Sequence, residues 1–214
     1  MMQVFDIEQG GDDWHAARLG IPTASRFATV MAKGEGKTRR EYMRKLAGEI
    51  ITGEPMDSYT NAHMERGKIM EDEARLKYAF VNDAEIHRVG FIRNGDKGAS
   101  PDSLVGQNGG LEIKTALPHI QIERLELNRL PPEHKAQVQG NIWIADREYW
   151  DFVSYWPRLP MLTVRVHRDE AYIADMAAEI DAFNAELATM VDRIRNYGVT
   201  LREMPQIAQN FMAG

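Results

Sequence analysis

Apolar residues recur three or four positions apart through most of the first third of the chain, which is the spacing of amphipathic helices. This pattern predicts helices over residues 23–31 and 38–51, each beginning at a threonine suited to cap the first turn. A third helix is predicted from about residue 58 to residue 80. The first part of the chain, residues 1–82, is therefore expected to be mainly helical.

Short apolar and β-branched runs replace this pattern in the middle of the chain. They predict strands over residues 86–92, 99–105 and 111–115, and the last two are separated by a turn at Gln107-Asn108-Gly109-Gly110. Three consecutive strands with short connections are expected to form a meander.

Helical spacing returns over residues 119–128 and 133–145, and strands are predicted over 148–156 and 161–167. The first of these strands has large side chains on both faces, as expected of a central strand. A long amphipathic helix is predicted over residues 169–195.

This order of elements predicts an α/β fold with a central mixed sheet flanked by helices. We expect one domain over residues 1–214, with the sheet core in 83–168 and a C-terminal helix and tail in 169–214. No repeat or low-complexity linker divides the sequence.

The composition, with 43% hydrophobic and 27% charged residues, is that of a soluble globular protein. No apolar run approaches the roughly 20 residues of a membrane span, so no membrane association is expected. Acidic Asp6 and Glu8 near the N-terminus are unlike a signal peptide, and cysteine is absent. The sequence therefore predicts a cytoplasmic protein and excludes disulfides, thiolate metal sites and cysteine nucleophiles.

The net charge of −6 argues against a nucleic-acid partner until its distribution is considered. Residues 169–192 hold seven acids and no Lys or Arg, and the rest of the chain carries a net charge of +1. Residues 33–45 carry a net charge of +4. This basic run is suited to a phosphate backbone, although a solvated helix face would have the same composition.

The candidate chemistry lies in Ser100-Pro101-Asp102 and, beyond the turn, in Glu112-Ile113-Lys114. Residues two apart on a strand share a face, so Glu112 and Lys114 should project together while Ile113 enters the core. The hairpin should place Asp102 beside them. Two carboxylates make an oxygen-rich pocket suited to Mg²⁺ or Mn²⁺.

A lysine beside two carboxylates favours metal-assisted phosphodiester hydrolysis, because its ammonium group can orient the attacking water and offset phosphate charge. The competing interpretation is an exposed ion pair between Glu112 and Lys114. Residues 34–38 imitate the end of an ATP-binding phosphate loop, but the first glycine of that motif would fall at Met31 and a helix precedes it. ATP binding is therefore rejected.

The Pro101-Asp102 and Glu112-Ile113-Lys114 pattern resembles the PD-(D/E)XK nuclease superfamily and its restriction-endonuclease-like core. Residues 14–25, 67–75 and 136–139 are similar to the phage lambda exonuclease, or YqaJ-type viral recombinase, family. The resemblance implies a Mg²⁺-dependent exonuclease that digests linear double-stranded DNA from its 5′ ends, releases 5′-mononucleotides and leaves 3′ overhangs. It also implies a ring-shaped homotrimer that acts with a single-strand annealing protein in a phage-carrying bacterial cell.

The resemblance also implies roles for individual residues. Metal ligands would be Asp102, Glu112 and the Ile113 carbonyl, with Glu71 near the metal. Lys114 would act on the water. The remaining implied residues would position the nucleophile or contact phosphate: Gln139, Arg18, Ser25 and Ser100. Two departures from the family pattern are Ser103 in place of Gly and Thr115-Ala116 in place of Cys-Pro.

Physical arguments support some of these roles independently. Arg18 has the planar fork that grips phosphate, Ser25 lies in the first turn of a predicted helix, and Trp14 is close enough in sequence to Arg18 to contact DNA. Gln137 and Gln139 cannot share a helix face, and Gln139 is favoured for function by its position in the motif. Without the family pattern, Glu71 would be assigned to a solvated acidic face.

Two other functions retain the same cluster. A restriction-like or nicking endonuclease would use the same hydrolytic residues, since these do not determine how DNA enters the site. A non-catalytic DNA-binding recombination scaffold would have a site that no longer binds metal, and the presence of Asp102, Glu112 and Lys114 argues against it.

Overall fold

A computed structural model describes residues 1–32, 36–56 and 62–198. The predicted start of a helix at residue 58 lies outside the described residues. So do residues 33–35 of the basic run and of the rejected phosphate loop, and the tail from residue 199.

The central sheet has five strands in the order β2-β5-β6-β7-β8. Neighbouring strands are antiparallel except for β6 and β7, which are parallel, so the sheet is mixed as predicted. The strands are β2 (Ile86–His87), β5 (Ser103–Val105), β6 (Gly109–Thr115), β7 (Tyr149–Tyr155) and β8 (Leu162–His167).

Helices cover both faces of this sheet. Helix α4 (Ala62–Asn82) and helix α6 (Lys135–Ala145) both pack against β6 and β7. Leu111 and Ile113 of β6 form an apolar cluster with Ala74 and Tyr78 of α4, whereas Glu112 bonds to side chains of α6. Successive side chains of β6 therefore point alternately toward α4 and toward α6. The parallel connection from β6 to β7 runs through α5 (Pro118–Leu127), the short helix η2 (Pro132–His134) and α6.

A second, three-stranded antiparallel sheet has the order β1-β3-β4. It contains β1 (Met2–Phe5), β3 (Phe91–Asn94) and β4 (Lys97–Ala99). The predicted strand over residues 86–92 is therefore wrong as one element, because β2 pairs with β5 and β3 pairs with β1. Strand β1 was not predicted, since its four residues are mostly exposed and show no buried alternation.

The predicted strand over residues 99–105 is also divided, into β4 and β5. The break is Ser100-Pro101-Asp102, where Pro101 has no N–H to donate to a neighbouring strand. The two strands belong to different sheets, and the segment between them crosses from one sheet to the other. Both polar residues of this segment are thereby released from strand pairing.

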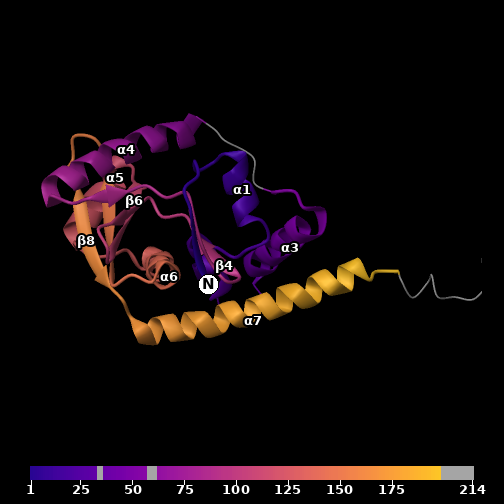
Figure 1. Cartoon of the computed structure of the whole chain (residues 1–214). Coiled ribbons are helices and arrows are strands. Elements are labelled where there is room, and N and C mark those ends of the chain that lie inside the picture. The colour runs from indigo at the N-terminus through magenta and orange to yellow at the C-terminus, as the bar shows by residue number, and fades with distance from the viewer. Residues whose placement is uncertain (33–35, 57–61, 199–214) are drawn as a thin grey trace, which may run out of the picture.

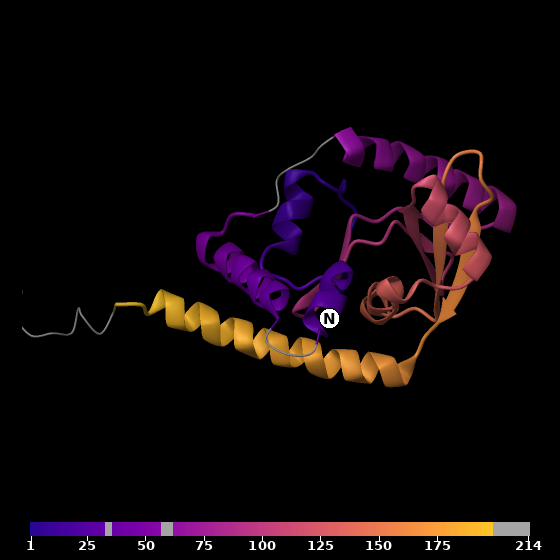
Figure 2. The same ribbon diagram turned by 180° about the vertical axis from the view of Figure 1, so that it is seen from behind.

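The remaining helices of the N-terminal part are α1 (Asp12–Arg18), η1 (Ala24–Arg26), α2 (Phe27–Val30) and α3 (Lys37–Thr52). Of these, η1 and α2 contact α6. The long helix α7 (Glu170–Arg195) runs along the outside of the molecule, on the side opposite α4 (Figures 1 and 2). It packs against α2, α3 and α6.

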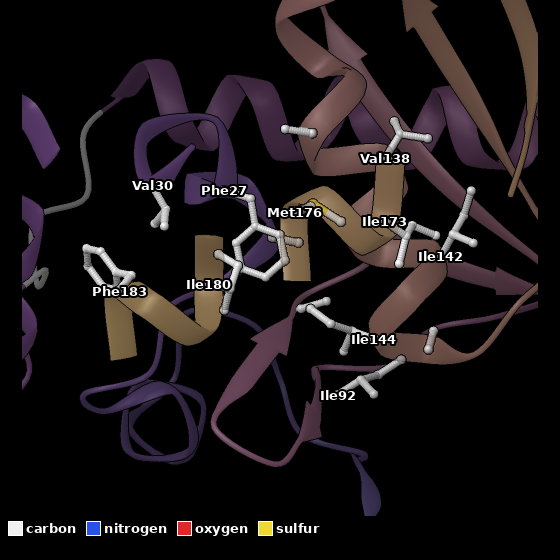
Figure 3. Packing of buried hydrophobic residues seen from close by; sticks show 14 of the residues in the cluster. Phe27, Val30, Ile92, Val138, Ile142, Ile144, Ile173, Met176, Ile180 and Phe183 are labelled. Carbon is white, nitrogen blue, oxygen red and sulfur yellow. The ribbon is translucent and has the colours of Figure 1, made fainter. Parts of the chain in front are cut away.

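The main hydrophobic core lies where α2, α6 and α7 meet (Figure 3). Phe27, Met176, Ile180 and Phe183 are fully buried there. A Cβ atom on Gly140 of α6 would lie 2.6 Å from the Phe27 ring, so only glycine permits this approach of helix to helix. Within the described ranges, no helix is both long and apolar enough to cross a membrane.

Candidate active site

Asp102, Glu112 and Lys114 converge where β5 and β6 pair. Ser103 lies opposite Leu111 in the antiparallel register, which brings the preceding Asp102 beside Glu112. The Asp102 carboxylate accepts a 2.5 Å hydrogen bond from the Ile113 N–H, and Lys114 Nζ lies 2.6 Å from Glu112 Oε1. The hairpin and the alternation of β6 therefore position these groups as the sequence predicts.

The Glu112 carboxylate is buried and held by two amides of α6. Gln137 Nε2 donates to Glu112 Oε1 over 2.6 Å, and Asn141 Nδ2 donates to Glu112 Oε2 over 3.0 Å. Gln137 and Asn141 are four residues apart and therefore share a helix face. These bonds fix the orientation of Glu112. The ion pair with Lys114 in the competing interpretation is present, but Glu112 is buried, so the pair is not an exposed one.

Gln139 lies elsewhere, which corrects its predicted position at the nucleophile. Its side chain is 1% exposed and makes two bonds to backbone groups near the start of α7. Nε2 donates to the His167 carbonyl over 2.8 Å, and Oε1 accepts from the Asp169 N–H over 3.1 Å. The sequence argument that the two glutamines take different faces was right, but Gln137 is the one that reaches the cluster.

Glu71 lies at the edge of the cluster on α4, where it pairs with Arg75 one turn later. Arg75 is buried; it also pairs with Asp72, and its Nε donates to Ser103 Oγ over 3.1 Å. Ser103 follows Asp102 directly. The departure from the family's glycine therefore supplies a hydroxyl that connects α4 to the strand carrying the site.

The carboxylates of the cluster repel one another. Burial raises the pKa of Asp102 well above its ordinary value, and the negative charges of Glu112 and Glu71 raise it further. Burial also raises the pKa of Glu71, against the opposing effect of Arg75. For Lys114, burial lowers the pKa, but the charges of Glu112 and Asp102 outweigh it and the net shift is upward. Additional positive charge at the cluster would stabilise the ionised carboxylates.

These residues fit a hard divalent cation by donor chemistry, since all the side-chain acceptors are carboxylate oxygens. In the part of the chain that the structure describes, no three His, Cys, Asp or Glu side chains gather as a complete metal cluster. A cation would therefore need main-chain oxygens or water in addition to Asp102 and Glu112. A cavity of about 480 Å³ reaches both Asp102 and Glu71 and leaves room for such ligands.

A second group of predicted residues meets at Ser100. Arg18 Nη1 donates to Ser100 Oγ over 2.7 Å, and Trp14 Nε1 donates to the same oxygen over 2.9 Å. The Arg18 guanidinium lies 3.9 Å from the centre of the Trp14 ring. Burial lowers the pKa of Arg18 to about 10, so the group stays cationic at neutral pH.

Ser25 belongs to the same group, because it lines a cavity of about 250 Å³ next to Arg18 and Trp14. Arg18 and Trp14 line the cavity, together with Ser25 and Thr23, whose hydroxyl oxygens are 3.3 Å apart. Ser25 lies in the short helix η1, is exposed, and is one of the residues that line the cavity. The structure therefore brings Trp14, Arg18, Ser25 and Ser100 into one neighbourhood.

The two groups are joined by three residues of backbone. Ser100 contacts Arg18, and Asp102 contacts the N–H of Ile113. Two residues of extended chain span at most about 7 Å. The Arg18–Ser100 contact and the Asp102–Ile113 contact therefore lie at the two ends of one short segment.

The second departure from the family pattern also has a structural use. The Ala116 N–H donates to the Tyr155 carbonyl over 3.1 Å and extends the pairing of β6 with β7 by one residue. Proline at this position would have no N–H for that bond.

The family model of the YqaJ-like viral recombinase domain matches residues 13–148, which include every site residue described above. The chain belongs to the YqaJ-like viral recombinase family. No curated protein sequence matches it.

Solved structures agree with this membership. The alkaline exonuclease LHK-Exo from Laribacter hongkongensis is 35% identical, with a TM-score of 0.81 over 89% of this chain and 100% of that one. The same enzyme in complex with dAMP gives 36% identity and a TM-score of 0.83 over the same shares. A phage-related exonuclease from Haemophilus somnus 129PT, 14% identical, shares the fold with a TM-score of 0.62 over 81% of this chain and 96% of that one. Family and fold together place this recombinase-family chain among the phage-type exonucleases.

Sequence reasoning missed three supporting residues of the site. Asn141 follows Gln137 by one helical turn, and that spacing was a usable signal. Arg75 follows Glu71 by one helical turn, which was also a usable signal, but its bond to Ser103 had none. Gln9 had none, because its partners are distant in sequence. Gln9 Nε2 donates to the Pro101 carbonyl over 2.9 Å and to the Val89 carbonyl over 3.2 Å, which ties down the segment between the two groups.

Proposed function

We propose that the chain is a Mg²⁺-dependent exonuclease that degrades linear double-stranded DNA from the 5′ end. It would release 5′-mononucleotides and leave 3′ single-stranded overhangs for annealing. The observation that carries the proposal is the short Ser100-Pro101-Asp102 segment, which separates the Arg18 cation from the Glu112 cluster. A phosphate held at Arg18 would lie at the opposite end of this segment from the hydrolytic residues, which favours cleavage near a DNA end.

In this proposal, Asp102, Glu112 and the Ile113 carbonyl would hold Mg²⁺, with Glu71 acting through water, and Mn²⁺ would substitute. When bound, the ion would polarise the scissile phosphate and lower the pKa of the attacking water. The repulsion between Asp102 and Glu112 supports the assignment, because a cation between the two carboxylates would relieve it.

The chain's own residues orient the reactants. Lys114 would donate from Nζ to the attacking water or to a phosphate oxygen, from its place beside Glu112. Gln137 and Asn141 hold both oxygens of Glu112, which keeps this ligand in one orientation during turnover.

Each cut leaves a phosphate at the new 5′ end. The residues gathered around Ser100 would hold this phosphate. Arg18 would provide the charge and a forked donor, and Ser25 and Ser100 would provide hydroxyl groups. Trp14 stacks on the Arg18 guanidinium and restricts its rotamers, so less entropy is lost when phosphate binds.

A comparison of linear and covalently closed DNA tests the proposal. Linear duplex with 5′-phosphate ends should be degraded with Mg²⁺ and left intact with chelator, while closed circular duplex should survive in both. Cutting of the closed circle would instead establish the endonuclease alternative. DNA binding without hydrolysis of either substrate in Mg²⁺ would establish the non-catalytic scaffold.

We further propose that three chains form a ring and act with a single-strand annealing protein. Family membership supports both proposals. Light scattering should give a mass of three 24.4 kDa chains, and a phage-type single-strand annealing protein that is co-expressed with this chain should co-purify with it. A monomer at working concentrations would overturn the first proposal, and separate elution of the two proteins the second.

A further inference from the structure

The cavity beside Arg18 contains a second cation that comes from a different helix. Lys45 of α3 lines the cavity together with Arg18 of α1. The Lys45 side chain is 21% exposed, and its Nζ lies 4.0 Å from Glu49 Oε1. The lining of the cavity therefore carries positive charge from both α1 and α3.

The Glu49 carboxylate also accepts hydrogen bonds from the backbone. Its Oε2 accepts from the Gly20 N–H over 2.9 Å, and its Oε1 accepts from the Met56 N–H over 3.3 Å. Gly20 has a φ of +68°, and a Cβ there would lie 2.4 Å from the Ile50 side chain. This buried carboxylate thus fastens the loop after α1 to α3, and much of its charge is directed to backbone donors.

The charge of the lining is suited to a dianion. Three cations, Arg18, Arg26 and Lys45, face one carboxylate, Glu49, which leaves an excess of two positive charges when His15 is neutral. Burial lowers the pKa of Lys45, the charge of Glu49 raises it, and the charges of Arg26 and Arg18 lower it further. A bound anion would relieve the repulsion between Lys45 and the arginines.

We propose that Lys45 is the specificity residue of this cavity and distinguishes a terminal phosphate monoester from a phosphodiester. A monoester carries about −1.5 to −2 charges at pH 7, by analogy with a phosphorylated side chain, whereas a diester carries a single charge. Arg18 meets the first charge with its planar fork, and Lys45 meets the second as a point charge. The cavity would then favour a true 5′ end over an internal phosphate of the strand. The inference rests on the proposed function and deepens it.

The test compares three short duplexes that differ only at one 5′ end: a hydroxyl, a phosphate, and a phosphate methyl ester. Their dissociation constants are measured by fluorescence anisotropy in chelator, so that binding is observed without hydrolysis. Wild type should bind the phosphate end most tightly, then the methyl ester, then the hydroxyl. In Lys45→Met, affinity for the phosphate end should fall roughly tenfold, to that of the methyl ester, while affinity for the methyl ester stays unchanged.

Lys37→Met is the matched control. It removes one lysine charge from the same helix, but the Lys37 side chain is 88% exposed and pairs with Glu41 outside the cavity. This variant should keep the wild-type ratio of phosphate to methyl ester affinity. Lys45→Arg, which retains the charge, should keep part of the preference, and Lys45→Gln replaces Lys45→Met if thermal melting shows that the latter is unfolded.

Two outcomes would overturn the inference. Equal weakening of all three ends in Lys45→Met would show a general attraction for DNA, and an unchanged phosphate to methyl ester ratio would show that Lys45 does not contact the terminal phosphate. Failure of the proposed function is distinguishable, because it would appear as loss of end-dependent hydrolysis in Mg²⁺ and not as a change of the affinities measured in chelator.

Discussion

Gln137 donates from Nε2 to Oε1 of Glu112 over 2.6 Å, the same oxygen that faces Lys114. The bond joins the middle of β6 to the first turn of α6, on the face of the sheet that α6 covers. Because α6 is otherwise buried in the core, the position of Glu112 depends on the packing of the whole helix.

Replacing Gln137 should mainly slow cleavage, whereas replacing Gln139 should mainly lower stability. Gln137→Ala should slow single-turnover cleavage about tenfold to a hundredfold, as expected for a residue that orients a metal ligand, with little change in stability. Gln139→Ala should lower the free energy of unfolding by about 1–3 kcal/mol, because the His167 carbonyl and the Asp169 N–H lose a buried partner. Urea unfolding and single-turnover rates of both variants check this, and a rate loss confined to Gln139→Ala would contradict it.

Asp102→Asn should stabilise the protein in chelator. The pKa of Asp102 is raised in the folded protein, so wild type gains stability as pH falls from neutral through that raised pKa and loses it as pH rises. At neutral pH the variant should melt about 2–4 °C higher than wild type, and the difference should shrink towards lower pH. Thermal melts between about pH 5 and 8 measure this.

The same variant should respond differently to metal. Mg²⁺ should raise the melting temperature of wild type, because it binds the folded state, and should leave Asp102→Asn nearly unchanged. Hydrolysis by the variant should be lost while DNA binding is retained. Activity near that of wild type would reject Asp102 as a metal ligand.

Lys114→Arg should separate charge from geometry. The guanidinium keeps the positive charge, but its planar fork does not reproduce a compact ammonium group 2.6 Å from Glu112. Single-turnover cleavage should fall about a hundredfold or more, and DNA affinity should change only a few-fold. If the arginine variant cleaves at the wild-type rate, Lys114 acts only as an electrostatic anchor.

Arg18→Ala should narrow the difference between 5′-phosphorylated and 5′-hydroxyl ends. Arg18 and Ser100 form one donor group, so its loss should slow the phosphorylated substrate about tenfold or more and the hydroxyl substrate much less. Initial rates on paired substrates decide the point. A contact with another backbone phosphate would slow both substrates equally and leave their ratio unchanged.

Ser103→Ala should weaken the connection between α4 and the site. The buried Arg75 Nε–H loses its acceptor, which should cost about 1–3 kcal/mol of stability. Because Glu71 pairs with the same arginine, the Mg²⁺ concentration for half-maximal rate should also rise. Thr115→Ala, at an exposed position at the end of β6, serves as the control and should change neither quantity.

Local patterns in the sequence determined the type of most elements and the face of each β6 side chain. Period-two alternation alone places Glu112 and Lys114 together and Ile113 in the core, because a strand has no other way to arrange them. The spacing of apolar residues likewise predicts α3, α5, α6 and α7 to within a few residues.

Only the tertiary structure decided which elements meet. One apolar run became β4 and β5 in different sheets, because strand pairing is a contact between distant segments and Pro101 allows the crossing. Helical spacing separated Gln137 from Gln139, but which face met β6 depended on how α6 packs between sheet and helices. The cavity lined by both Lys45 and Arg18 lies between two helices, and the bond from the Gly20 N–H to Glu49 connects them; no local pattern encodes that connection.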